Sequence, residues 1–191
     1  MTLLQRAQSV LTTPTAYFQS IRPEKALGTP VTYLLVLSAI FLCLRTLLFT
    51  VSPPTVSPEE IAALAQIGFM PQAGSAASGF ATAIFTFALS FVNAGLLHLF
   101  ARLLRGQGAY VDTYKAVAYS MTPQMLLSSF PYIGILGSLY SLYLLIKGLG
   151  VLHGMSLGRA ILTLVLAALT VIIIVLVPIF FFLFMLAKGL S

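Results

Sequence analysis

The stretch that decides the fold is residues 116–160, AVAYSMTPQMLLSSFPYIGILGSLYSLYLLIKGLGVLHGMSLGRA. It is an apolar hairpin that is interrupted by Pro123 and Pro131 and followed by a short polar turn around His153. Apolar runs of this length, separated by turns, are typical of helices that lie in a bilayer. The stretch therefore predicts the middle of a polytopic membrane protein.

The composition of the whole chain agrees with that prediction. Hydrophobic residues make up 59% of the 191 positions and charged residues only 7%, whereas soluble domains carry about 25% charged residues. Such a chain cannot cover its surface with groups that face water, so lipid must solvate much of it. We expect an all-α, polytopic helical membrane protein without a separate soluble domain.

Five apolar segments are candidate membrane spans. They are predicted at residues 31–51, 80–101, 113–130, 132–149 and 160–187. The third and fourth have only about 15 to 18 apolar residues, against roughly 20 for a comfortable span. These two segments either cross completely or form a re-entrant hairpin that protein covers. In both cases residues 31–191 form one membrane domain.

Residues 1–30 form an amphipathic segment before the first span. Apolar residues recur at helical spacing in its first half, and Thr13-Pro14 is typical of the start of a second short helix. The segment either lies in the membrane interface, with basic side chains toward the headgroups, or packs on the cytoplasmic loops. The basic side chains are Arg6, Arg22 and Lys25.

The placement of charge predicts the orientation. Basic residues flank alternate connections: Arg6, Arg22, Lys25, Arg102, Arg105, Lys115, Lys147 and Arg159. The other side holds Glu59, Glu60 and Lys188. Because cytoplasmic loops carry the excess of lysine and arginine, we expect the N-terminus in the cytoplasm and the C-terminus outside.

Four short motifs are spread along the hairpin and the turn after it. They are Tyr119-Ser120-Met121-Thr122-Pro123, Pro131-Tyr132-Ile133-Gly134, Leu142 to Gly148, and His153-Gly154-Met155-Ser156 with Arg159-Ala160. With these motifs, and with an N-terminal proline, an aromatic pair and Ile21-Arg22, the chain resembles the Yip-one domain family, in particular its prokaryotic members. The resemblance implies five spans, a cytoplasmic N-terminus and a non-cytoplasmic C-terminus.

The resemblance also bears on partners and location. Eukaryotic members are associated with Golgi and ER trafficking and with Rab-type GTPases. This chain lacks the long cytoplasmic region that those members carry before the first span, which puts GTPase binding in doubt. Its brevity is more similar to bacterial or archaeal members of the plasma membrane, so we expect a multi-pass protein of the plasma (inner) membrane.

Polar residues inside the predicted spans are candidate functional residues, because burying charge in hydrocarbon is expensive. Arg45 either snorkels or pairs with Glu59 or Glu60, or it contacts a substrate or lipid headgroup. Asn93 and His98 are expected to form hydrogen bonds with the third span.

The expected partners of Asn93 and His98 are Ser120, Thr122 and Gln124. As an alternative, His98 acts as a protonation switch near the interface. Lys147 is expected to anchor the fourth span at the interface.

Pro123 and Pro131 would open the backbone of the third segment and free carbonyl groups, which Ser120, Thr122 or a ligand can satisfy. Such breaks either shape a hairpin or mark a binding site, as in transporters with broken helices. The candidate functional residues are therefore Arg45, Asn93, His98, Tyr119, Pro123, Gln124, Pro131, Lys147 and His153.

Several function classes are excluded by missing patterns. The chain has no HExxH, G-x-S-x-G, P-loop or dinucleotide-binding motif. All four carboxylates lie in predicted loops: Glu24, Glu59, Glu60 and Asp112. The lone Cys43 forms neither an intrachain disulfide nor a metal site. We therefore expect no enzyme activity, no cofactor, no metal and, without a basic stripe, no nucleic-acid binding.

The sequence leaves two functions open. The first is a non-enzymatic membrane scaffold that contacts the lipid bilayer, a membrane-protein partner or a second copy of itself. The alternative is a transporter or channel for lipids or small solutes that uses the hairpin at residues 113–149.

Overall fold

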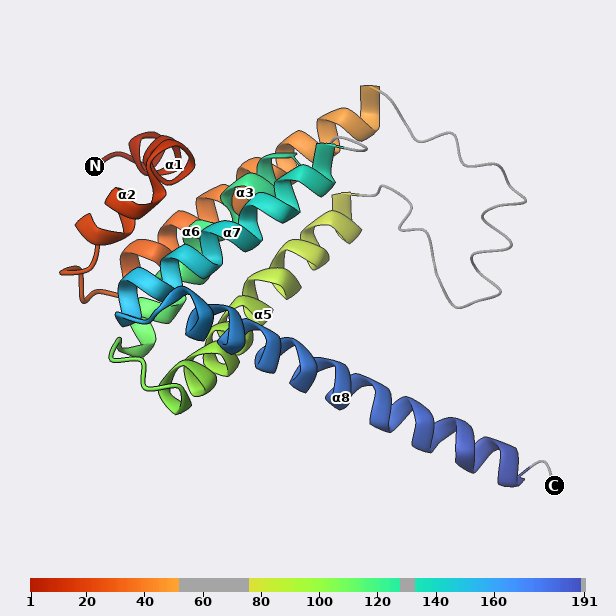
Figure 1. Ribbon diagram of the computed structural model, residues 1–191. Helices are drawn as coiled ribbons and strands as arrows, with labels where there is room; N and C mark the ends of the chain where they lie inside the picture. The colour runs from red at the N-terminus through yellow and green to blue at the C-terminus, as the bar shows by residue number, and fades with distance from the viewer. Residues whose placement is uncertain (52–75, 128–132, 190–191) are drawn as a thin grey trace.

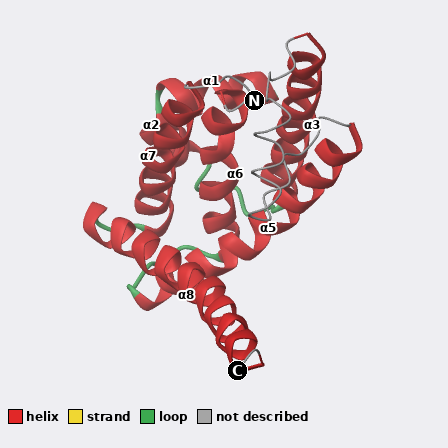
Figure 2. Ribbon diagram, turned by 90° about the vertical axis from the view of Figure 1, so that its right-hand side faces the viewer, coloured by secondary structure: helices red, strands yellow, loops and turns green. Residues whose placement is uncertain are grey.

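The computed structural model describes residues 1–51, 76–127 and 133–189, and within these ranges the regular structure is entirely α-helical (Figures 1 and 2). The helices are α1 (Leu3–Thr12), α2 (Pro14–Ser20), α3 (Gly28–Val51), α5 (Ala76–Leu103), α6 (Tyr110–Leu127), α7 (Ile133–His153) and α8 (Leu157–Gly189). The predicted all-α fold is confirmed. The five long helices, α3 and α5 to α8, occupy the five predicted segments.

Four of the five long helices are long and apolar enough to cross a membrane, namely α3, α5, α7 and α8. The exception is α6, which has 18 residues and a length of about 27 Å at 1.5 Å per residue. It begins three residues before the predicted start and carries Asp112 and Lys115 in its first turns. The predicted count of five spans is therefore approximate.

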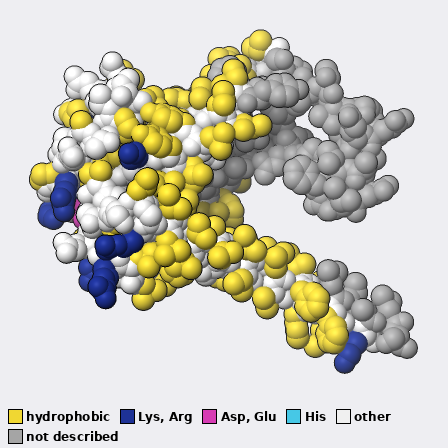
Figure 3. Space-filling view, in the orientation of Figure 1, with side chains coloured by type: hydrophobic (Ala, Val, Ile, Leu, Met, Phe, Trp, Pro, Cys, Tyr) yellow, Lys and Arg dark blue, Asp and Glu magenta, His cyan; other side chains and the backbone are white. Residues whose placement is uncertain are grey.

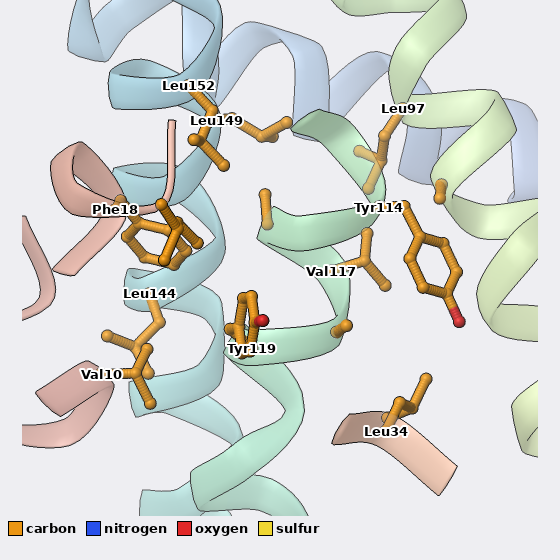
Figure 4. Packing of buried hydrophobic residues seen from close by; sticks show 14 of the residues in the cluster. Val10, Phe18, Leu34, Leu97, Tyr114, Val117, Tyr119, Leu144, Leu149 and Leu152 are labelled. Carbon is orange, nitrogen blue, oxygen red and sulfur yellow. The ribbon is translucent and has the colours of Figure 1, made fainter. Parts of the chain in front are cut away.

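The other helices of the bundle enclose α6. It contacts α7 most extensively and also contacts α1, α3 and α5. Figure 4 shows its Tyr114 and Tyr119, both fully buried, among Leu144 of α7, Leu97 of α5 and Leu34 of α3. A helix with this many polar residues is stable at membrane depth only when protein covers it.

The two N-terminal helices pack on the hairpin of α6 and α7 (Figure 1). Val10 of α1 and Tyr17 and Phe18 of α2 are buried against it. At Gly148 of α7 the ring of Phe18 comes so close that an added Cβ would lie 2.9 Å from it. The N-terminal helices are therefore packed on the helices of the bundle, and the placement of residues 1–30 in the membrane interface or on the cytoplasmic loops stays a prediction.

The two ends of the bundle differ in charge. The connections from α2 to α3, from α5 to α6 and from α7 to α8 lie at one end (Figure 1). Figure 3 shows most of the visible lysine and arginine side chains at that end, another near the C-terminal end of α8, and apolar side chains over much of the surface between them. The long helix α8 starts there, buries Ala160, Thr163 and Ala167, and then departs from the bundle with an exposed apolar surface.

We predict that Gly137→Ala destabilises the hairpin. A Cβ at Gly137 of α7 would lie 2.8 Å from the carbonyl oxygen of Pro123 in α6, and backbone cannot move aside easily. We expect the free energy of unfolding to fall by about 1–3 kcal/mol, which is measured as a lower melting temperature in mild detergent. Gly95→Ala in α5 is the matched control, because nothing lies within 4 Å of its Cβ position. Equal melting temperatures for the two variants would contradict the close approach.

Candidate functional site

A buried ammonium group lies at the charged end of the bundle. Lys115 is fully buried, and its Nζ lies 2.7 Å from Oδ1 of Asp112. Nζ also donates to the carbonyl oxygens of Ile21 at 3.0 Å and Glu24 at 2.8 Å. Two of the three ammonium protons are thus hydrogen-bonded to carbonyl oxygens, and the Asp112 carboxylate balances the charge. The contact joins α6 to the connection between α2 and α3.

A second ion pair lies beside the first and ties α1 to the same region. Arg6 and Glu24 form a two-pronged contact, with Nη2 to Oε1 at 2.9 Å and Nη1 to Oε2 at 3.3 Å. Arg6 Nη1 also donates to the hydroxyl of Tyr119 at 3.0 Å. The hydrogen bond to Glu24 raises the pKa of Arg6 above its ordinary value. Arg6 therefore remains charged and holds α1 against α6.

The proline in α6 is accommodated by a short hydrogen-bond chain. Pro123 has no N–H to donate to the carbonyl of Tyr119 four residues earlier. The Thr122 hydroxyl donates to that carbonyl oxygen at 2.7 Å, and it lies 2.7 Å from the hydroxyl of Tyr33 in α3. Since the Thr122 proton is used, Tyr33 is the donor in the second contact. Of the three alternatives that the sequence left open for this carbonyl (Ser120, Thr122 or a ligand), the structure has Thr122 as the donor.

Two histidines from distant parts of the chain meet at one threonine. The Thr113 hydroxyl lies 2.9 Å from Nδ1 of His98 in α5 and 2.8 Å from Nε2 of His153 at the end of α7. One hydroxyl proton serves one imidazole, so the other imidazole must donate to the oxygen. Nδ1 of the fully buried His153 has no protein partner. Because a buried N–H is rarely left unpaired, we infer that the His153 proton sits on Nε2 and that Thr113 donates to His98.

The turn between α5 and α6 closes over this pair of histidines. The N–H of Gln107 donates to the carbonyl oxygen of His153 at 3.0 Å. A Cβ at Gly108 would lie 2.9 Å from the His153 ring, and one at Gly106 would lie 3.0 Å from it. Glycine at these two positions lets the turn pass directly over the imidazole. His153 at the end of α7 is thereby covered by the α5–α6 turn, a contact that sequence alone does not predict.

The structure corrects the predicted partners of the second span. His98 is hydrogen-bonded to Thr113 at the start of α6, not to the predicted residues near Pro123. Asn93 lies on an exposed face of α5. The prediction was wrong because α5 and α6 are antiparallel neighbours, so residues near the end of α5 lie beside the beginning of α6. Ser120 and Thr122 instead donate to carbonyls of their own helix.

The remaining candidates are scattered. The Gln124 side chain is exposed, while its N–H donates to Ser141 of α7 at 3.0 Å. Lys147 is half-buried, and its Nζ lies 5.7 Å from the centre of the Tyr143 ring. The side chain of Arg45 lies outside the described residues. So do Pro131, Glu59 and Glu60.

Sequence reasoning missed the main charged residues of the site. Asp112 was expected in a loop with the other carboxylates, but it lies inside α6 and is buried with Lys115. Their spacing of three residues, which places both on one face of a helix, was the available signal. Arg6 was expected to face the headgroups, but its side chain is only 11% exposed and turns inward to Glu24. Local sequence carries no signal for a contact between residues 6 and 24.

The arrangement is suited to holding helices together. Both described carboxylates are engaged by cations. Among the residues that the structure describes, no group of three or more His, Cys, Asp or Glu side chains could hold a metal ion. The charges neutralise one another within the protein, and their contacts join α1, the α2–α3 connection and α6.

We predict that Lys115→Met strongly destabilises the protein, because the buried Asp112 carboxylate would lose its counter-charge. Breaking a buried ion pair from one side costs about 3–5 kcal/mol. The double variant Lys115→Met/Asp112→Asn should lose less stability than the sum of the losses in the two single variants. Thermal melting in detergent measures these losses. Lys25→Met removes an exposed lysine and serves as the control. Identical melting of Lys115→Met and Lys25→Met would refute a structural role for the buried pair.

We predict that Thr113→Val, a change of similar shape, destabilises the contact between α5, α6 and α7. Without the hydroxyl, the two imidazole nitrogens of His98 and His153 lose their shared partner. Each buried polar group that is left unpaired lowers the stability by about 1–3 kcal/mol. Thr163→Val is the matched control, because Thr163 is equally buried but donates only to Arg159 O in its own helix. The melting temperature of Thr113→Val should be the lower one, and the reverse order would contradict the assigned network.

Comparison with known families gives a direct match over most of the chain. The family model of the Yip1 domain matches residues 9–179, from α1 to within α8. Comparison with curated proteins and with solved structures found no match. The matched region contains all the hydrogen-bonded polar contacts around α6 except the Arg6 end of one ion pair. The chain therefore belongs to the Yip1 domain family and is a multi-pass integral membrane protein.

Proposed function

We propose that this chain is a non-enzymatic membrane scaffold, which acts through contacts of its outer surfaces with lipids, with a membrane-protein partner or with a second copy. The observation that carries the proposal is that the charged groups around α6 form their ion pairs and hydrogen bonds with other groups of the same chain. Lys115 has three internal partners, and Arg6 has two. Groups committed in this way stabilise a fold and are not available to a substrate.

The close packing of the hairpin supports the same function. Gly137 brings the backbone of α7 against the carbonyl of Pro123, and the N–H of Gln124 is satisfied by Ser141 across the hairpin. Such contacts leave little room for a water-filled path between α6 and α7. The apolar surface of α8 beyond Ala167 is instead available for lipid or for another membrane helix.

The alternative function is a transporter or channel for lipids or small solutes. It is favoured by Pro123, which interrupts the hydrogen bonding of α6 in the way that broken helices do at transport sites. The carbonyl that the proline frees already accepts a hydrogen bond from Thr122. The scaffold function is therefore the better supported of the two.

The orientation is part of the proposal. Apart from Lys188 near the C-terminus, the exposed cations that the structure describes gather at the end that holds the connections α2–α3, α5–α6 and α7–α8 (Figure 3). By the bias of lysine and arginine toward cytoplasmic loops, this end faces the cytoplasm of a plasma (inner) membrane. The C-terminus of α8 would then lie on the outer side.

Cysteine labelling tests the function and the orientation together. In a Cys43→Ser background, we would introduce Gln107→Cys in the exposed α5–α6 turn and, separately, Ser141→Cys in the hairpin interior. A membrane-impermeant thiol reagent would be applied to intact cells and to inside-out vesicles. We expect Gln107→Cys to react only in inside-out vesicles and Ser141→Cys to react in neither, because the hairpin interior is dry.

Each outcome of the labelling has a defined meaning. Reaction of Ser141→Cys in native membranes would reveal a water path and favour the transporter. Reaction of Gln107→Cys in intact cells would invert the orientation. Reaction of both cysteines after denaturation in detergent shows that each thiol is present and chemically competent.

A further inference from the structure

We propose that a pocket at the charged end of the bundle binds the phosphate-bearing headgroup of an anionic phospholipid, with Lys147 as the cation. The pocket lies where the second half of α7 meets the start of α2 and the start of α8. Its lining includes Thr15, Lys147, Gly150, Val151 and Leu157. The inference rests on the proposed function, because it requires a protein that works through contacts with lipids.

The size and the lining of the pocket suit a headgroup. Its volume is about 220 Å³, below the roughly 300–1,000 Å³ of pockets that enclose a whole small molecule. Val151 and Leu157 give the pocket apolar walls, and Lys147 and Thr15 are the lining residues with a basic and a hydroxyl side chain. A phosphate at Lys147 can therefore be held while the acyl chains of the same lipid lie outside, along the apolar faces of α7 and α8.

The charge balance at this end favours an anion. The two described carboxylates, Glu24 and Asp112, are engaged by Arg6 and Lys115, and neither lines the pocket. The field at the pocket is therefore set by cations. The exposed ones at this end are Arg22, Lys25, Arg102, Arg105 and Arg159. A zwitterionic headgroup gains less than an anionic one from such a field, because its own cation is repelled.

Lys147 also lies at the depth where a headgroup belongs. It stands six residues before the end of α7 at His153, which is about 9 Å along the helix axis. Beside it lies the ring of Tyr143, which is stacked on Tyr140 at 5.8 Å. Tyrosines of this kind mark the membrane–water interface. Further along α7, the exposed Leu139 provides apolar surface for an acyl chain.

Native mass spectrometry of the purified full chain tests the pocket. The protein in detergent would be titrated with phosphatidylglycerol and, separately, with phosphatidylcholine of the same acyl chains. We expect phosphatidylglycerol to bind more tightly, and Lys147→Gln to weaken its binding about fivefold, as for the loss of one lysine near an anionic surface. Binding of phosphatidylcholine should not change.

Two further variants separate the pocket from general surface charge. Lys25→Gln removes the same charge from an exposed position at the same end that does not line the pocket, and it should weaken phosphatidylglycerol binding clearly less than Lys147→Gln. Gly150→Leu keeps Lys147 but fills the pocket, and it should lose phosphatidylglycerol binding while its melting temperature verifies folding. Equal losses in Lys147→Gln and Lys25→Gln, or full binding by a folded Gly150→Leu, would overturn the proposal.

A competition experiment identifies the source of the phosphate. Inorganic phosphate, added at an ionic strength matched with sodium chloride, should not displace phosphatidylglycerol more than the chloride does. Specific displacement would show a site for free phosphate and overturn the lipid assignment. Unchanged lipid binding by Lys147→Gln would refute the lipid pocket. It would leave the scaffold function standing, because labelling at Ser141 tests that function independently.

Discussion

The buried ammonium group of Lys115 is the constraint on which the rest of the structure depends. A lysine at full burial is tolerated only when its charge is paired and its protons are hydrogen-bonded. Here the partners come from its own helix and from two carbonyls in the α2–α3 connection. The N-terminal helices are thus part of the bundle, because without their connection Lys115 would lack two of its three partners.

The same requirement explains why α6 occupies the centre. Its first half carries charges and its second half carries Pro123, so neither half is suited to contact with lipid. Enclosure by α1, α3, α5 and α7 provides partners for both. Arg6 reaches Tyr119 from one side, and Tyr33 reaches Thr122 from another. The outer helices, in contrast, present apolar residues to lipid and need few polar contacts.

The polar interior and the outer pocket have different consequences for function. The charged groups around α6 are paired within the bundle, so substitutions there should act on stability. Lys147 lies outside this network, next to a cavity whose lining holds no carboxylate. It is therefore a charge beside a pocket that the internal ion pairs leave available for the proposed lipid headgroup.

Sequence patterns located much of the fold and little of the site. Composition and apolar runs predicted the helices, and the loss of an N–H at Pro123 predicted a freed carbonyl with Thr122 as one of its candidate partners. The predicted partner of His98 was wrong, because the register of α5 against α6 is set by packing along both helices. The pairing of Asp112 with Lys115 was missed, because the predicted start of α6 was three residues late and left Asp112 in a turn.

The sequence by itself determined the helical class, the lengths of the apolar segments and the family, because these follow from local composition, periodicity and motifs. Only the tertiary structure decided which polar groups meet. The Arg6–Glu24 pair, the cover over Lys115 and the junction of His98, Thr113 and His153 join residues from 15 to 94 positions apart. Their meeting depends on how the helices and their connections pack at one end, and no single stretch of the chain encodes that arrangement.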